Sequence, residues 1–244
     1  MIRRAAALVL PLALVACNSA DPEMSRAEGA RGFPRPDRPI SSVVSTEFST
    51  EDQRDNLGEA QVVMDLAAIK AGTTVADIGA GEGYYTVRLA ERVGSKGRVL
   101  AQDIDGEAMQ RLGQRIVRER LDNVSIKVGA PENARLPENS FDRIFMVHMY
   151  HEVTEPYAFL WHMRPALRSG GQLIVVDADR PTDKHGMPPA LLFCEFNAVG
   201  FRLVEFVRKP ELKGYYAQFE AVGPRPQPQD IKPCTAAKGK TGTQ

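Results

Sequence analysis

The chain has 244 residues, with 31 basic and 31 acidic side chains and therefore no net formal charge. This length fits one large domain with tails, and it is enough to bury a substantial core. An even charge balance gives no electrostatic support for a nucleic-acid substrate, although a local basic patch would escape such a count. We therefore assign no nucleic-acid partner.

The first 17 residues have the composition of a targeting segment. Arg3 and Arg4 precede an apolar run at residues 5–16, which is too short for an ordinary transmembrane helix. The sequence Leu14-Val15-Ala16-Cys17 resembles the lipobox of bacterial lipoproteins, in which the cysteine is acylated and becomes the N-terminus. This resemblance implies a membrane-anchored lipoprotein, or a domain that faces the periplasm. The alternative is translation from Met24, which would leave the protein in the cytoplasm.

Two stretches lack the periodicity of folded elements. Residues 18–49 begin with a sequence rich in Pro, Gly and Arg, and we predict a flexible tether there. Residues 224–244 carry spaced prolines and a Lys/Thr/Gly-rich end, which predicts a disordered tail. The folded domain is expected at residues 50–223.

The cysteines give no sign of a structural cross-link. Cys17, Cys194 and Cys234 show no paired spacing in the sequence. Neither a zinc knuckle nor a disulfide framework is therefore indicated.

Strand-like and helix-like segments alternate along the predicted domain. Apolar residues recur at helical spacing over residues 55–70. Five short apolar strands, each separated from the next by a helix, are predicted at residues 74–78, 98–103, 124–128, 141–147 and 172–177. Two final strands are predicted at residues 201–207 and 215–221. This alternation predicts an α/β fold whose parallel sheet binds ligands at the carboxyl ends of its strands.

The most informative motif follows the first predicted strand, in the sequence Asp77-Ile78-Gly79-Ala80-Gly81-Glu82-Gly83. Glycines let the backbone approach a ligand closely, and the N-terminus of the following helix offers free N–H donors. The dinucleotide-binding fingerprint requires a third glycine at the position of Tyr84. A carboxylate at Asp77 would repel a phosphate, but it suits a ligand with a cationic amino group.

A second carboxylate lies where a ribose ligand is expected. Asp103 ends the strand at residues 98–103, about 20 residues past the first glycines, and nucleoside-binding α/β folds place a ribose-binding carboxylate there. The alternative is that Asp103 or Asp105 only caps the helix predicted at residues 107–120. The spacing from Gly79 favours the ligand role for Asp103.

The glycine turn resembles motif I of the class I S-adenosylmethionine (SAM) dependent methyltransferases. Asp103, the stretch Leu136 to Ile144 and the Gly170-Gly171 turn extend this resemblance over roughly residues 50–222. It implies a single-domain, doubly wound, Rossmann-like sheet of seven strands, mostly parallel with an antiparallel last strand. It also implies methyl transfer from SAM, for which we expect a small-molecule acceptor.

The same resemblance indicates how the cofactor is bound. The family usually has an acidic adenine contact where this chain has Ala130, so that Glu132 or backbone groups would have to substitute. The predicted cofactor-binding residues are Asp77, Gly79, Ala80, Gly81, Asp103 and Ile104.

The acceptor side is expected where the fourth and fifth strands end, because the resembled family makes these strands neighbours. The polar residues that follow the two strands are His148, Tyr150, His151, Glu152, Asp177, Asp179 and His185. One hypothesis makes His151 a general base, and another makes the histidines and carboxylates a divalent-metal site. A third has Tyr150 and His151 only hydrogen-bonded within their loop. Because the spacing fits no fixed ligand pattern, we assign no metal ligands and predict His151 and Tyr150 as catalytic residues.

A competing function is a binding module that holds SAM or a related nucleoside without turnover. The loss of the acidic residue at Ala130, together with a signal segment that would place the domain where SAM is scarce, favours this alternative. The intact glycine turn and Asp103 favour an enzyme. A dehydrogenase is disfavoured by Tyr84.

Overall fold

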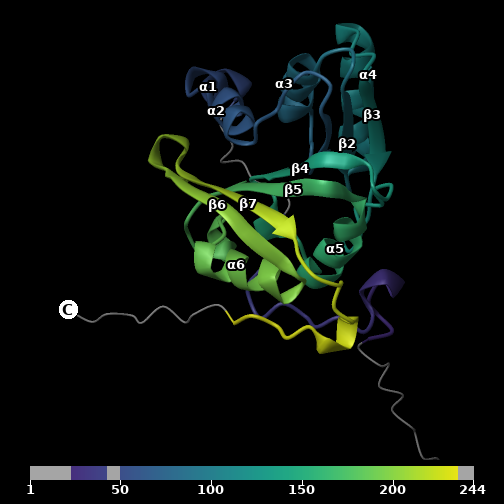
Figure 1. Cartoon of the computed structure of the whole chain (residues 1–244), viewed down its shortest axis with the longest axis vertical. Helices are drawn as coiled ribbons and strands as arrows, with labels where there is room; N and C mark the ends of the chain where they lie inside the picture. Colours follow the sequence, from purple (N-terminus) through teal and green to yellow (C-terminus); the bar gives the residue numbers. More distant parts are fainter. Residues whose placement is uncertain (1–22, 43–49, 236–244) are drawn as a thin grey trace, which may run out of the picture.

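A computed structural model describes residues 23–42 and 50–235 of the chain (Figure 1). The predicted lipobox at Cys17 lies outside these residues. Within them, no helix has the length and apolar character needed to cross a membrane.

A seven-stranded sheet forms the centre of the fold, with strand order β3-β2-β1-β4-β5-β7-β6. The first five strands pair in parallel, and β7 runs antiparallel between β5 and β6. The strands are β1 (Thr74–Ile78), β2 (Arg98–Asp103), β3 (Val124–Val128), β4 (Phe141–Val147), β5 (Leu167–Asp177), β6 (Phe201–Lys209) and β7 (Gly214–Ala221). This arrangement confirms the predicted doubly wound, Rossmann-like sheet with an antiparallel last strand.

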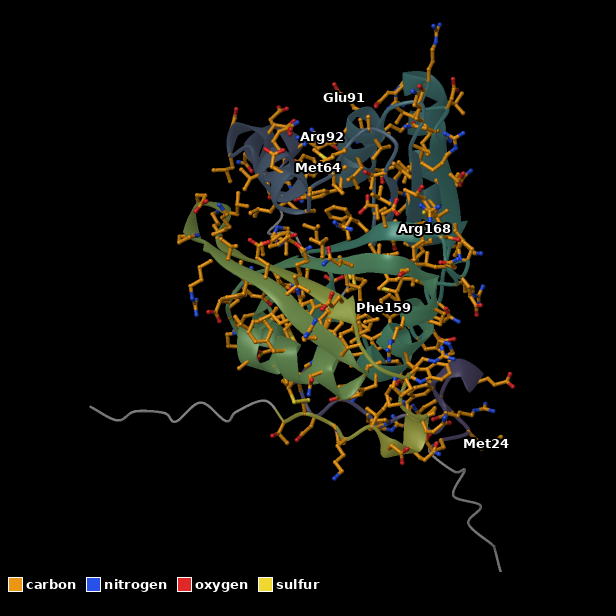
Figure 2. The ribbon with its side chains drawn as sticks, viewed as in Figure 1. Met24, Met64, Glu91, Arg92, Phe159 and Arg168 are labelled. Carbon is orange, nitrogen blue, oxygen red and sulfur yellow. A yellow bond between two sulfur atoms is a disulfide. The ribbon has the colours of Figure 1, made fainter. Side chains whose placement is uncertain are left out.

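Helices cover both faces of the sheet. They are α1 (Glu51–Asn56), α2 (Glu59–Leu66), α3 (Tyr84–Val93), α4 (Gly106–Glu119), α5 (Pro156–Met163) and α6 (Pro189–Ala198). Figure 1 shows α1 to α3 on one side of β4 and β5, and α5 and α6 on the other. Met64 and Phe159, labelled in Figure 2, belong to the two apolar clusters that these helices form on opposite faces. Two buried layers therefore hold the sheet, as expected for an α/β domain.

Two predicted helices differ from the structure. The helix expected at residues 55–70 is divided into α1 and α2 at Gly58, whose positive φ of 63° ends one helix before the next begins. Thr50 and Gln53 form a capping box at the start of α1. The helix expected between β3 and β4 is absent, since residues 129–140 form turns with one short bridge between Ala130 and Asn133.

The predicted flexible tether is wrong for residues 23–42, which pack against the domain and are called the N-terminal segment below. Its Phe33 is buried beside Trp161, with their ring centroids 5.4 Å apart. The side chain of Arg38 is fully buried, and its Nε donates to Glu195 Oε1 of α6 at 2.8 Å. The hydrophobic periodicity of the sequence does not predict this packing, because isolated contacts rather than a repeating apolar face hold the segment.

The prediction of a disordered tail is likewise wrong for residues 224–235. A short 3₁₀ helix, η6 (Pro228–Asp230), is followed by buried Ile231 and Cys234. Cys234 forms a disulfide with Cys194 of α6, which corrects the expectation that no disulfide is present. The two cysteines are 40 residues apart, and sequence spacing alone does not reveal which distant cysteines meet in the fold.

The buried pair of Arg38 and Glu195 predicts that the N-terminal segment contributes to global stability. Replacing Arg38 with Met leaves the Glu195 carboxylate buried beside Tyr150 without its cation. We expect the free energy of unfolding to fall by about 3–5 kcal/mol, measured by urea denaturation. Arg35→Met is the matched control, because the Arg35 side chain is exposed and its ion pair with Glu23, at 3.6 Å, lies on the surface. Its effect should stay within about 0.5 kcal/mol, and equal losses in the two variants would contradict the role of Arg38.

Candidate active site

The glycine turn lies at the carboxyl end of β1 and leads into α3. Gly79, Gly81 and Gly83 all have positive φ, the left-handed region that side chains disfavour. A Cβ on Gly83 would lie 2.4 Å from Leu112 Cδ1, so packing also requires this glycine. A Cβ on Gly81 would have nothing within 4 Å, which marks open space in front of the turn. The turn therefore presents bare backbone to open space.

Asp103 lies directly across from this turn. Its Oδ2 accepts the backbone N–H of Gly81 at 2.9 Å, and its Oδ1 accepts that of Asp105 at 3.0 Å. The helix-capping role belongs instead to Asp105, which accepts from the backbone N–H groups of Glu107 and Ala108. Asp103 is thus free of the capping role that competed with the ribose-ligand prediction.

Asp77 is placed differently from the expectation of a carboxylate that meets the ligand directly. Its side chain is buried and accepts a hydrogen bond from Thr86 Oγ1 at 2.6 Å, between β1 and the first turn of α3. Burial raises the pKa of the Asp77 carboxyl to about 6, although the hydrogen bond from Thr86 acts to lower it. A cationic group near the turn would favour the ionised form of this carboxyl through its field.

The other residues considered for the cofactor, Ile104, Ala80 and Glu132, differ in their surroundings. Ile104 is 42% exposed and follows Asp103 directly, so it offers an apolar surface suited to a nucleoside base. Ala80 packs against the small apolar cluster beneath α4. Glu132, the proposed substitute at the adenine, lies against Gly29 of the N-terminal segment. Open space over Gly81, the Asp103 carboxylate and exposed Ile104 together fit a nucleoside-bearing cofactor such as SAM.

The loop after β4 touches the glycine turn. A Cβ on Gly79 would lie 2.9 Å from Met149 Cγ, so the two loops are in contact. His148 begins this loop with a positive φ of 54°, and its Nε2 lies 3.4 Å from Glu59 Oε1 of α2. Such a backbone conformation is uncommon for a residue with a side chain, and it turns the chain sharply out of the strand. The next turn, η2 (Tyr150–Glu152), is thereby held beside the cofactor space.

His151 is the central side chain of the acceptor side. It is 1% exposed, and its Nδ1 lies 3.0 Å from both carboxylate oxygens of Asp177 at the end of β5. Since a carboxylate only accepts, Nδ1 carries the proton, and in the neutral imidazole Nε2 then presents a lone pair. Nε2 is buried and has no hydrogen-bond partner. Asp177 thus fixes both the orientation and the tautomer of His151.

Two further side chains face that lone pair. Oε1 of Glu152 lies 3.9 Å from His151 Nε2 and 3.9 Å from Nδ1 of His185. Burial raises the pKa of the Glu152 carboxyl to about 7; His151 acts to lower it, and the nearby carboxylates of Asp103 and Asp177 add to the rise.

The structure does not bring the other predicted acceptor-side residues to this group. The Tyr150 side chain is fully buried, and its hydroxyl donates to Glu195 Oε2 at 2.8 Å. Asp179 pairs with Arg208 at 2.8 Å. His148 contacts Glu59 of α2, as described above. His151, Glu152, Asp177 and His185 are therefore the residues that converge.

The N-terminal segment supports this group in a way that sequence reasoning missed. Arg38 donates to the backbone carbonyl groups of His151 and Val153, at 3.3 and 3.4 Å. The backbone N–H of His185 donates to Ser41 Oγ at 3.1 Å. Single polar residues in an aperiodic stretch carry no sequence signal for such contacts.

The arrangement offers two chemistries beside one cofactor space. A histidine lone pair oriented by a buried carboxylate is suited to accept a proton. Two histidines and a carboxylate that face one another are also suited to ligate a divalent metal ion. Both would act on a molecule held next to the glycine turn.

Comparisons with known proteins agree with this geometry. A family model described as a methyltransferase domain matches residues 69–198, more than half of the chain. A SAM-dependent methyltransferase structure from Aquifex aeolicus is 22% identical, with a TM-score of 0.63, and the match covers 72% of this chain and all of that one. At this identity the structural match supports the fold alone.

Two ubiquinone/menaquinone biosynthesis C-methyltransferases UbiE are among the similar proteins. The protein from Hahella chejuensis is 30% identical over 126 residues, which cover 49% of each chain. The protein from Methylococcus capsulatus is 27% identical over 176 residues, which cover 70% of this chain and 68% of the relative. The chain thus spans about half the length of the first relative and two thirds of the second. With the family match over residues 69–198, the chain belongs to the methyltransferase-domain family, and its fold is similar to that of a SAM-dependent methyltransferase.

Proposed function

We propose that this methyltransferase acts on a small-molecule acceptor held between the glycine turn and the His151 loop. SAM supplies the methyl group on a sulfonium, which is already a good leaving group. The chain must therefore align the two molecules, exclude water and assist loss of a proton from the acceptor. The observation that carries the proposal is the contact of Met149 with Gly79, which joins the cofactor space to the buried His151.

The residues divide into two sets in this proposal. Gly79, Gly81, Asp103 and Ile104 hold the cofactor, and Asp77 acts on it through its charge. His151 assists the acceptor through its Nε2 lone pair, and Asp177 is a positioning residue that holds its Nδ1–H. Tyr150 supports the loop through Glu195 rather than meeting the acceptor. This set departs from the initial prediction, in which Tyr150 shares the catalytic role.

The alternative of a binding module without turnover is less well supported. A binding module would use only the cofactor-binding residues. The buried pair of His151 and Asp177 would then contribute to stability alone. A buried histidine nitrogen without a hydrogen-bond partner is costly for stability alone. The acceptor-side group therefore favours an enzyme.

The first test of the proposal is cofactor binding by Gly81→Val. The added side chain would fill the open space in front of the turn, so that the thermal shift caused by SAM or its demethylated product should be lost. For the parent chain, ligand at 100 times its dissociation constant should stabilise the fold by about 2.7 kcal/mol. Methyl transfer is then assayed with a panel of phenols, thiols and amines.

Gly72→Val is the matched control for the first test. Gly72 also has a positive φ, and a Cβ added to it would have no atoms within 4 Å, but it precedes the amino end of β1. Gly72→Val should have a similar backbone strain, but SAM or its demethylated product should still raise its melting temperature. A parent chain that responds to NAD but to neither SAM nor its product would overturn the proposal.

The second test separates Asp103 from Asp105. Asp103→Ala should weaken SAM binding by about 1.5–3 kcal/mol in calorimetry, the range for a hydrogen bond to a charged group. Asp105→Ala should instead cost about 1 kcal/mol of folding stability through loss of the α4 cap, with unchanged affinity. Equal affinity in the parent chain and Asp103→Ala would remove Asp103 from the cofactor site.

We also propose that the protein is exported and anchored through a lipidated Cys17. The alternative is that translation begins at Met24 and the protein stays in the cytoplasm. The Cys194–Cys234 disulfide supports this proposal, because disulfides persist in oxidising compartments and are rare in the cytosol. The signal-like residues 1–17 support it independently.

N-terminal mass spectrometry of the full chain, recovered from a bacterial host, tests the export proposal. The parent should begin at an acylated Cys17, and Cys17→Ser should remain unprocessed. Cys194→Ser is the control, since it should be processed normally while it loses the disulfide. A native N-terminus at Met24 would show that the protein is cytoplasmic.

A further inference from the structure

Beyond the proposed methyl transfer, and resting on it for the identity of the acceptor, the structure assigns a divalent-metal site to His151, Glu152 and His185. The ligand atoms of these residues, two imidazole nitrogens and one carboxylate oxygen, all lie within 4.8 Å of one another. Two of the separations are 3.9 Å. A metal ion about 2.1 Å from each atom would fit among them after a small inward movement.

Unpartnered ring nitrogens mark this cluster. Among the residues that the structure describes, four buried side-chain polar atoms have no hydrogen-bond partner, and two of these are Nε2 of His151 and Nδ1 of His185. His151 belongs to the loop after β4, while His185 follows η4 (Thr182–Lys184) beyond β5. Two orphan nitrogens from separate loops meet beside one carboxylate. Most buried polar groups find a partner, so this pairing points to a bound ligand.

The surroundings resemble the outer shell of a metal site. A metal-ligating histidine donates its other ring N–H to a carboxylate or carbonyl group, which fixes the tautomer that binds. Asp177, fully buried, plays this part for His151 at 3.0 Å. Ser41 accepts the backbone N–H of His185 and thereby fixes the second loop. Both histidine positions are thus supported by residues that do not contact the metal.

Local charge also favours a cation at this point. The side chain of Glu152 is only 16% exposed, and the fully buried carboxylate of Asp177 lies on the other side of the His151 ring, 3.0 Å from Nδ1. A divalent cation would offset this concentration of negative charge. The donor set of two imidazoles and one carboxylate suits zinc or iron(II), whereas magnesium prefers oxygen ligands alone.

The metal would determine the class of acceptor. Three protein ligands leave coordination positions open, and an acceptor hydroxyl bound there would lose its proton more readily. Because the metal would occupy Nε2 of His151, the acceptor oxygen would release its proton to solvent rather than to His151. It would form the bond to the methyl carbon as the carbon–sulfur bond breaks. The metal keeps its oxidation state. The preferred acceptors are therefore phenols and other hydroxyl compounds rather than amines.

Metal binding to the chelator-treated full chain tests the site without any need for turnover. Calorimetry with Zn²⁺ should show one site per chain, and Mg²⁺ at the same concentration should give none. His185→Ala should weaken Zn²⁺ binding by at least about 100-fold, and Asp177→Asn by about 10- to 100-fold through the outer shell. His162→Ala is the control: its Nε2 contacts the Gly29 carbonyl oxygen outside the cluster, and it should bind as the parent does.

Binding of the demethylated cofactor is measured in the same samples. His185→Ala should retain it, which shows that the variant is folded and separates the two proposals. Zn²⁺ binding that is absent from the parent, or equal in the parent and His185→Ala, would overturn the metal site. If the parent chain does not bind the demethylated cofactor, the methyl-transfer proposal is overturned, whereas the metal-binding result is unaffected.

Discussion

The position of β4 between β1 and β5 is the constraint on which the site depends. Met146 pairs with Ile78 of β1, and Val147 pairs with Val176 of β5, so the three strands end nearly level. The glycine turn, the His151 loop and Asp177 are therefore delivered to one edge of the sheet. Residues 144–146 of β4 are completely buried and alternate between the two apolar clusters, which fixes the register against a slip.

Residues outside the family match complete the acceptor side. The match begins at residue 69, whereas Arg38 and Ser41 lie in the N-terminal segment. Arg38 is held by Glu195, and from there it donates to two carbonyl groups of the His151 loop. Because an unpaired charge buried at this position would be costly, the segment is fixed to the domain rather than lying loosely on it. The acceptor side thus combines residues inside the family match with two supporting residues outside it.

The parts of the fold that sequence predicted correctly are those with a local signal. Short apolar runs located β1 to β4, and alternate glycines located the cofactor turn, because each requirement falls on neighbouring residues. The Cys194–Cys234 disulfide and the Arg38–Glu195 pair join positions far apart in the chain. No local pattern encodes such contacts, and the tether and tail predictions are therefore wrong for residues 23–42 and 224–235.

For the acceptor-side residues, the sequence likewise does not predict the direction in which each side chain points. Tyr150 and His151 are adjacent in η2, yet one side chain points to Glu195 and the other to Asp177. In a single turn, consecutive side chains leave in different directions, and sequence does not say which one faces the ligand. His185 itself ends η4 in the left-handed conformation, and this conformation brings it to Glu152. Only the folded chain reveals it.

The unpartnered nitrogens of His151 and His185 have a thermodynamic consequence for the free protein. Each buried polar atom without a hydrogen bond costs about 1–3 kcal/mol, a large part of the stability of a domain. These atoms belong to two loops that hydrogen bonds with Asp177, Arg38 and Ser41 hold in place. A ligand that satisfies both nitrogens would recover that energy as affinity. Local rules are broken in this way chiefly at functional sites, and here the break lies beside the cofactor turn.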